Sequence, residues 1–214
     1  ATPCDATQLS YIVDWVAYGA AGNGTAGNGE GGTSVNNGVA LTNTQGGVRQ
    51  QAGCKDTNDN NADFDVTTPP IPRNTSTSFA CGGASPTPTP TFTATNTPTG
   101  TPSATSTATE TGTATNTATP TPTQTPPTGP TFVLSQVYGG GGATSGTPTY
   151  TNDYVEIKNI TASPQSLHLL KLYYGSALGN FASFSGNEYL LPNVTVNPGQ
   201  FYLFQLGPVG AVGA

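Results

Sequence analysis

The densest group of side chains that could do chemistry is an Asn- and Asp-rich run at residues 56–65. Asp56, Asn58 and Asn60 alternate like the first three oxygen ligands of a calcium loop, and Asp63 supplies a further carboxylate. The glycine and the closing bidentate glutamate of an EF-hand are missing, which excludes an EF-hand. Two interpretations stay open: calcium bound by Asp56, Asn58, Asn60 and Asp63, or Asx turns in which these side chains bind their own backbone.

The sequence offers little for catalysis. His168 is its one histidine, and it lies in an apolar stretch that is typical of a strand. A Ser-His-Asp or Cys-His site needs the imidazole beside a carboxylate and a nucleophile, and nothing in the sequence places these near His168. The glycine run at 139–142 lacks both G-x-G-x-x-G spacing and a G-K-[ST] ending, so it predicts a turn. We therefore expect no enzyme and no certain cofactor.

Covalent modification is a third kind of chemistry. The Asn-x-Ser/Thr sequon marks Asn23, Asn74, Asn159 and Asn193 as N-glycosylation candidates. Several matches are expected by chance in a chain so rich in Asn and Thr, so each is a candidate and no more.

The three cysteines are Cys4, Cys54 and Cys81. Cys54 and Cys81 bracket the Asn/Asp run and a Pro-rich return, and we predict that they form a disulfide. Closing a loop of this length contributes about 3 kcal/mol in the chain-entropy model. Cys4 then pairs in a segment outside this sequence or remains free.

The composition changes abruptly at residues 85–131, the linker. Its alternating Thr and abundant Pro cannot bury enough surface to fold, and favour an extended, polyproline-like chain of up to roughly 145 Å at about 3.1 Å per residue. The dense hydroxyls are typical of a mucin-like, O-glycosylated stalk, and a bare disordered spacer is the alternative. The O-glycosylation candidates are Thr87, Thr89, Thr91, Thr93, Thr95, Thr97, Thr99, Thr101, Ser103, Thr105, Thr107, Thr109, Thr111, Thr113, Thr115, Thr117, Thr119, Thr121, Thr123 and Thr125.

Charge and composition exclude several classes of protein. The 5 Lys and Arg residues against 11 Asp and Glu residues give a formal net charge of −6 at pH 7. Nucleic acid is therefore not an expected partner, because its binding depends on clustered Lys and Arg. No apolar run is long enough to span a bilayer. Cysteines in a Thr-rich, Lys-poor sequence without Met favour an exported protein, so we expect an extracellular, cell-surface location.

The linker separates two flanks, 1–84 and 132–214, that both have the pattern of strands divided by turn residues. No segment keeps a helical period, so we predict an all-β fold, a sandwich by its strand spacing. In the first flank we expect a strand at Tyr11–Tyr18. In the second flank we expect a strand at Tyr154–Asn159, with one face of Tyr154–Lys158 in water. The other strands expected in the second flank are Phe132–Tyr138, Leu167–Tyr174, Tyr189–Val196 and Phe201–Leu206.

Specific runs in both flanks resemble a known family, the bacterial lamin-tail domains. In the second flank, the runs that resemble the first half of that domain are FVLSQVYGGGG at 132–142, YTNDYVEIKN at 150–159 and PGQFYL at 198–203. In the first flank, those that resemble its second half are YIVDWVAYG at 11–19, NT at 43–44 through VR at 48–49, GCKDTNDNNADF at 53–64 and PRNT at 72–75. The resemblance implies an immunoglobulin-like β-sandwich used as a non-catalytic module. It also implies another strand or two between the segments that end here at Ala214 and begin here at Ala1.

We consider three functions. The first is a structural extracellular protein, in which bead-and-linker units repeat along a glycosylated cell-surface filament or stalk. The second is an accessory or targeting module of a secreted hydrolase or nuclease. The third is a carbohydrate-binding sandwich that uses exposed aromatic residues such as Tyr173 and Tyr174. Low charge and a long spacer favour the first.

The order of the halves suggests how such units join. A second half at the start and a first half at the end can complete a sandwich within one chain or between residues 132–214 of one unit and residues 1–84 of the next. A stiff linker favours completion between successive units, head to tail, which is an open contact that builds fibres. We therefore expect neighbouring copies of the chain to be its partners.

Overall fold

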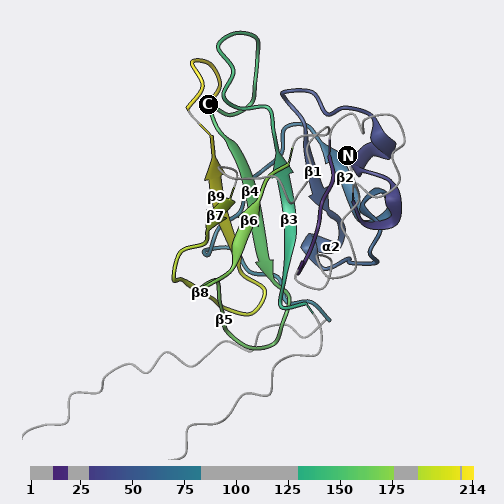
Figure 1. Cartoon of the computed structure of the whole chain (residues 1–214), viewed down its shortest axis with the longest axis vertical. Helices are drawn as coiled ribbons and strands as arrows, with labels where there is room; N and C mark the ends of the chain where they lie inside the picture. The colour runs from purple at the N-terminus through teal and green to yellow at the C-terminus, as the bar shows by residue number, and fades with distance from the viewer. Residues whose placement is uncertain (1–11, 19–28, 83–129, 176–187, 208) are drawn as a thin grey trace, which may run out of the picture. The chain divides into compact units, whose positions relative to one another are not determined.

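The computed structural model describes residues 12–18, 29–82, 130–175, 188–207 and 209–214. Its main feature is a five-stranded antiparallel sheet in the order β2-β1-β3-β4-β9 (Figure 1). The strands of this sheet are β1 (Gly46–Arg49), β2 (Phe64–Thr67), β3 (Phe132–Tyr138), β4 (Asp153–Asn159) and β9 (Phe201–Leu206).

Two short antiparallel ribbons complete the described strands. One pairs β5 (Gln165–Ser166) with β8 (Thr195–Val196), and the other pairs β6 (Lys171–Tyr173) with β7 (Glu188–Leu190). The helical turns have three or four residues each: η1 (Glu30–Gly32), η2 (Val35–Gly38), α2 (Gln50–Gly53) and α3 (Asn60–Asp63). The regular structure of the described residues consists mostly of strands in antiparallel sheets. This confirms the predicted all-β class.

The strand predictions in the second flank are partly right. β3 and β9 have the predicted bounds, and β4 begins one residue early. The predicted strand 167–174 keeps only its β6 portion, because a turn forms in which Leu170 N donates to Leu167 O and Leu169 has φ 68°. The predicted strand 189–196 is likewise divided between β7 and β8.

The predicted strand at 11–18 is wrong, since its described residues lie in no strand. The backbone hydrogen-bonding groups of residues 12–18 are bound by the Asn60 side chain and by a helical turn, and not by a neighbouring strand. Asn60 Nδ2 donates to Trp15 O at 3.0 Å, and Asn60 Oδ1 accepts from Ala17 N at 2.8 Å. Ala17 O accepts from Val35 N at 3.0 Å. Residues 12–18 are therefore held by loop side chains that no local pattern connects to them.

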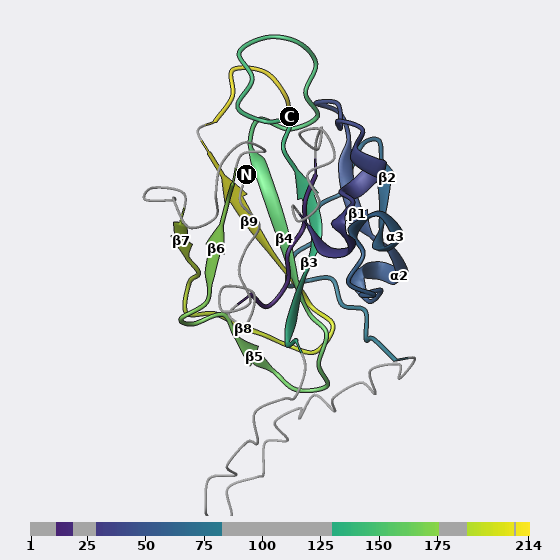
Figure 2. The same cartoon turned by 45° about the vertical axis from the view of Figure 1, so that its right-hand side comes forward.

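One face of the five-stranded sheet forms the apolar core. Val137, Val155 and Ile157 project from β3 and β4 into a cluster of buried side chains. The ribbons and their connections supply the opposing side chains, which are Leu167, Leu172, Leu191 and Val196. Figure 2 shows the ribbons on the side of β4 and β9 that is remote from β1 and β2.

The opposite face of β4 carries polar side chains that are also buried, so the prediction of one face in water is wrong. Tyr154 is 3% exposed, and Glu156 and Lys158 are 0% exposed. The alternation along the strand was predicted correctly, but a segment of the first flank covers this face. This crossing segment comprises residues 70–82.

The crossing segment makes contacts along its whole length. Pro70 O accepts from Tyr150 Oη at 2.7 Å, and Thr75 O accepts from Gln200 Nε2 at 2.6 Å. Ser78 then forms a β-bridge with Gln200, beside the edge strand β9. The segment thereby connects the β2 side of the sheet to the β9 side.

The two flanks meet within one chain. β1 pairs with β3 through Gly47–Val137 and Val48–Gln136, and Ala1–Ser85 with Thr128–Ala214 forms one compact unit, separate from Pro86–Pro127. The structure thus corrects the expectation that a stiff linker keeps the flanks of one chain apart: pairing in one chain already satisfies the open edge of β3. The linker's conformation and its O-glycosylation candidates lie outside the described residues and stay predictions.

Candidate functional site

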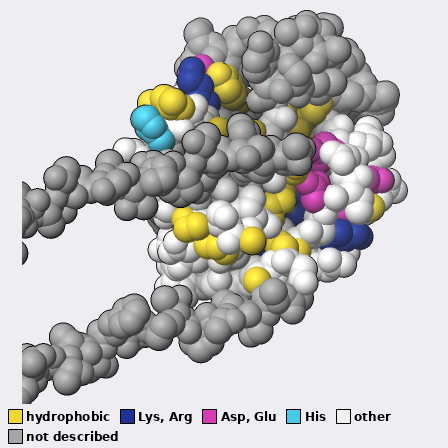
Figure 3. Space-filling view, turned by 90° about the horizontal axis from the view of Figure 1, so that it is seen from below, with side chains coloured by type: hydrophobic (Ala, Val, Ile, Leu, Met, Phe, Trp, Pro, Cys, Tyr) yellow, Lys and Arg dark blue, Asp and Glu magenta, His cyan; other side chains and the backbone are white. Residues whose placement is uncertain are grey.

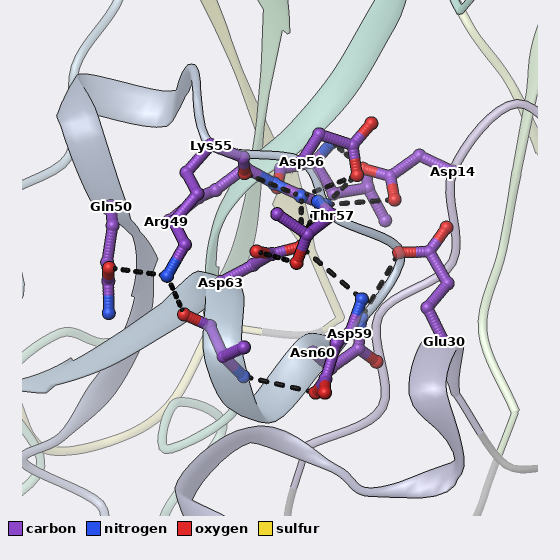
Figure 4. A network of polar contacts seen from close by, with 12 residues as sticks. Asp14, Glu30, Arg49, Gln50, Lys55, Asp56, Thr57, Asp59, Asn60 and Asp63 are labelled. Atoms are coloured by element: carbon purple, nitrogen blue, oxygen red, sulfur yellow. Dashed lines mark hydrogen bonds and ion pairs between the residues drawn. The ribbon is translucent and has the colours of Figure 1, made fainter.

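The polar interface between the flanks is the most elaborate arrangement of side chains in the described chain. Arg49, at the end of β1, is its first centre (Figure 4). The buried Arg49 guanidinium donates through Nη2 to both Asp14 oxygens at 2.8 and 2.9 Å. Through Nη1 it donates to Asp56 Oδ1 and Lys55 O, each at 3.0 Å. One cation therefore holds two carboxylates and a carbonyl of the first flank.

The same pair of side chains binds the second flank. Arg49 Nε donates to Leu134 O at 3.0 Å, and Leu134 N donates to Asp14 Oδ2 at 2.5 Å. The β3–β4 register shifts between Leu134 and Gln136, and the β1–β3 pairing reaches only to Gln136. Asp14 and Arg49 thus satisfy the β3 backbone where its pairing with β1 stops.

The predicted calcium ligands are used by other protein groups. Asp63 accepts from Thr57 N and Thr57 Oγ1, each at 2.7 Å, while Asp56 binds Arg49. Asn60 binds residues 12–18 through both its amide atoms, and Asn58 is exposed. The four do not form a calcium loop in the structure, which favours the Asx-turn interpretation.

Asp59 shows the same turn chemistry. Its Oδ1 accepts from Asn61 N at 3.0 Å and from Ala62 N at 3.1 Å, which caps the first turn of α3. Side chains of the run 56–65 therefore bind the backbone of the same run, and its Asp56 and Asp63 carboxylates lie beside Arg49.

A different set of carboxylates converges beside Arg49: Asp14, Glu30 and Asp56 each place an oxygen within 4.8 Å of the others. Burial, together with the charges of Asp14 and Asp56, raises the pKa of Glu30 to about 8, while Arg49 opposes the shift. Burial also raises the pKa of Asp14, against the attraction of Arg49. The sequence analysis did not predict Asp14 or Glu30 as part of this cluster. For Asp14, the available signal was that it is the one carboxylate in the apolar run 12–18.

The shift at Glu30 predicts a pH dependence of stability. Because the pKa rises from an ordinary value of 4.5 to about 8 on folding, the folded chain binds this proton more tightly. The contribution of Glu30 is then largest below pH 4.5 and is lost as the pH rises to about 8. We expect the free energy of unfolding of Glu30→Gln to fall less steeply than that of the natural chain over this range. Urea titrations at several pH values measure this, and equal slopes would contradict it.

Glu156 and Arg73 form the second centre of the interface. Arg73 Nη2 lies 2.7 Å from Glu156 Oε1, and Arg73 N donates to Glu156 Oε2 at 2.6 Å. Ser135 Oγ donates to Glu156 Oε1 at 2.6 Å, and the Arg73 guanidinium lies 4.0 Å from the centre of the Phe201 ring. The buried carboxylate of β4 is thus neutralised by an arginine from the other flank.

Lys158 lies beside this pair and also crosses between the flanks. Its Nζ donates to Ala52 O at 2.7 Å and to Cys54 Sγ at 3.0 Å. Burial, together with the charge of Arg73, lowers the pKa of Lys158 to about 8, while Glu156 opposes the shift. Lys158 therefore attaches β4 to the loop that holds the disulfide.

The structure contains the predicted disulfide, Cys54–Cys81, with a Cα–Cα distance of 5.4 Å. The bridge anchors the end of the crossing segment to the loop after α2. Replacing both cysteines with serine is expected to lower the free energy of unfolding by about 3 kcal/mol, because the denatured chain regains the loop entropy. Urea unfolding of the oxidised natural chain and the double variant measures the difference. Non-reducing peptide maps that join Cys4 to Cys54 would contradict the pairing.

The N-glycosylation candidates divide by exposure. Asn74 and Asn193 are exposed, whereas Asn23 lies outside the described residues. Asn159 is 0% exposed, and its Nδ2 donates to Ser163 O and Val196 O, both at 2.8 Å. A glycan on Asn159 would remove these bonds and could not fit the buried site, which corrects that prediction.

The exposed surface carries small groups of apolar side chains. Figure 3 shows hydrophobic side chains in scattered groups and acidic side chains gathered near Lys and Arg. Tyr173 and Tyr174, predicted to be exposed, are 41% and 45% exposed. His168 is also exposed, and its backbone N donates to Ser166 Oγ at 3.1 Å.

Within the described part of the chain, no helix has the length and apolar character needed to cross a membrane. Comparison of the chain with protein-family models, with curated proteins and with solved structures gives no match.

Proposed function

We propose that this chain is a structural extracellular protein, the repeating bead-and-linker unit of a glycosylated cell-surface filament or stalk. The bead is an immunoglobulin-like sandwich of the lamin-tail kind, built from residues 1–84 and 132–214. The linker, residues 85–131, carries O-glycans and joins successive beads where the flanks of neighbouring copies pair. Neighbouring copies of the chain, arranged head to tail, are its partners, and it is not an enzyme.

The observation that supports this proposal most is the use of charged side chains between the flanks. Arg49, Arg73 and Lys158 bind carboxylates or carbonyls across or beside the interface. Arg49 and Lys158 are buried, and the Arg73 side chain is 16% exposed. These contacts hold together the two flanks of a bead, which lie on opposite sides of the long linker in the sequence. A mechanically continuous filament needs such a bead.

Imaging of native material tests the proposal. We expect a regular filament of compact beads joined by thin connections no longer than roughly 145 Å, at about 3.1 Å per linker residue. Isolated particles that copurify with hydrolase or nuclease activity would instead support the accessory-module alternative and contradict the filament.

Glycosylation of the linker gives a separate prediction. Native protein is expected to exceed the polypeptide mass of 21.6 kDa, with the excess located in peptides from residues 85–131. Sugars on alternate residues would restrict the backbone and keep it extended. Intact mass spectrometry before and after chemical removal of O-glycans measures the excess. A native mass equal to that of the polypeptide would show that no sugars are present.

A further inference from the structure

We propose that the flanks exchange between copies, so that residues 132–214 of one copy bind residues 1–84 of a second copy through the contacts that close the single chain. This inference rests on the proposed function, because it names the surface by which neighbouring copies join. The partner is therefore a second copy of this chain, and the docking surface is the polar interface already described.

The contacts described between the flanks join residues of one flank directly to residues of the other. The β1–β3 ladder, the Arg73–Glu156 ion pair and the Lys158–Ala52 hydrogen bond each join one residue of the first flank to one of the second flank. A second copy can therefore supply the same groups in the same geometry, as in domain swapping.

Each flank alone would leave charged side chains and a strand edge without the partners that the other flank supplies. Without the first flank, Glu156 and Lys158 on β4 lose Arg73 and Ala52 O, and the edge of β3 loses β1. Glu156 and Lys158 would also lose the cover of the crossing segment, and the open edge of β3 would be free to pair with another chain. A flank whose own partner is occupied elsewhere therefore takes the complementary flank of a neighbour.

Closure within one chain and exchange between copies have the same contact energy. The difference between them is the effective concentration that the linker imposes on its own two ends, which falls steeply as a linker becomes longer than the span it must cross. Copies packed along a filament reach high local concentrations. Closure in one chain is then expected in dilute solution and exchange where copies are crowded.

Two full-length variants test exchange directly. Arg73→Met leaves Glu156 without a cation in its own chain, and Glu156→Gln leaves Arg73 without a carboxylate. In an exchanged heterodimer, one interface regains the natural Arg73–Glu156 pair and the other combines the neutral Met and Gln. We expect the two variants, unfolded and refolded together with the disulfide intact, to form a 1:1 heterodimer seen by native mass spectrometry. The double variant Arg73→Met/Glu156→Gln is the matched control and is expected to fold as a monomer.

Several results would overturn the inference. If the double variant folds and the mixture gives no heterodimer, the flanks do not exchange. If the double variant fails to fold, natural chains with and without isotope label are refolded together at rising concentration. Mixed-label dimers then support exchange, and their absence over the whole range overturns it. Filaments in native material together with absent heterodimers would reject exchange alone, whereas heterodimers without native filaments would reject the proposed function alone.

Discussion

Replacing Arg49 with methionine is expected to lower the free energy of unfolding by about 3–5 kcal/mol, a large share of the roughly 5–15 kcal/mol that holds a typical domain folded. The substitution leaves Asp14 and Asp63, whose side chains are 4% and 0% exposed, without their cation. It also removes the donor to Leu134 O in β3. Urea unfolding followed by tryptophan fluorescence and circular dichroism measures the loss.

Two control variants make this result specific. Arg49→Lys keeps the charge but loses the planar fork that reaches Asp14, Asp56 and Leu134 O together, so we expect an intermediate loss. Lys171→Met breaks the exposed Lys171–Glu188 pair and is expected to leave stability unchanged. If Arg49→Met were as harmless as Lys171→Met, the Arg49 network would not stabilise the fold.

Replacing Arg73 with methionine is expected to cost a similar amount, about 3–5 kcal/mol, because Glu156 stays buried without its cation. Adding Glu156→Gln in the same chain should restore most of the loss. The glutamine oxygen can still accept from residue 73 N, its amide nitrogen can donate to Ser135 Oγ, and the side chain carries no charge.

The comparison is a double-mutant cycle across the two flanks. A large coupling energy between residues 73 and 156 shows that the crossing segment lies on β4 in solution, although the two residues are 83 positions apart. Additive losses would show that the flanks do not meet there. The Cys54–Cys81 bridge must remain oxidised in all variants, because it anchors the same segment.

Local sequence determined the features that depend on nearby residues. Alternating apolar and β-branched side chains defined β3, β4 and β9 almost to the residue, since a strand's two faces repeat every second residue. Cysteine placement indicated the Cys54–Cys81 bridge. Thr and Pro composition predicts the linker at 85–131, because a segment whose one large apolar side chain is Phe92 cannot form a core.

Tertiary structure alone decided what covers each face. The alternation at 154–158 correctly separated Val155 and Ile157 from Glu156 and Lys158, but it could not show that both faces are buried. That burial depends on Arg73, which arrives from beyond the linker and neutralises Glu156. Partners so distant in sequence leave no periodic signal in the strand they cover.

Distant partners also explain why the sequence left two interpretations of the run 56–65 open. Its spacing permits either calcium ligation or self-bonded turns, and the position of Arg49, which engages Asp56, favours the turns. Residues 12–18 looked like a strand by composition, yet Asn60 supplies the hydrogen bonds that a neighbouring strand would have made. Local pattern thus set which residues could form strands and turns, whereas long-range charge pairing and hydrogen bonding decided which of them were buried, paired or left as loops.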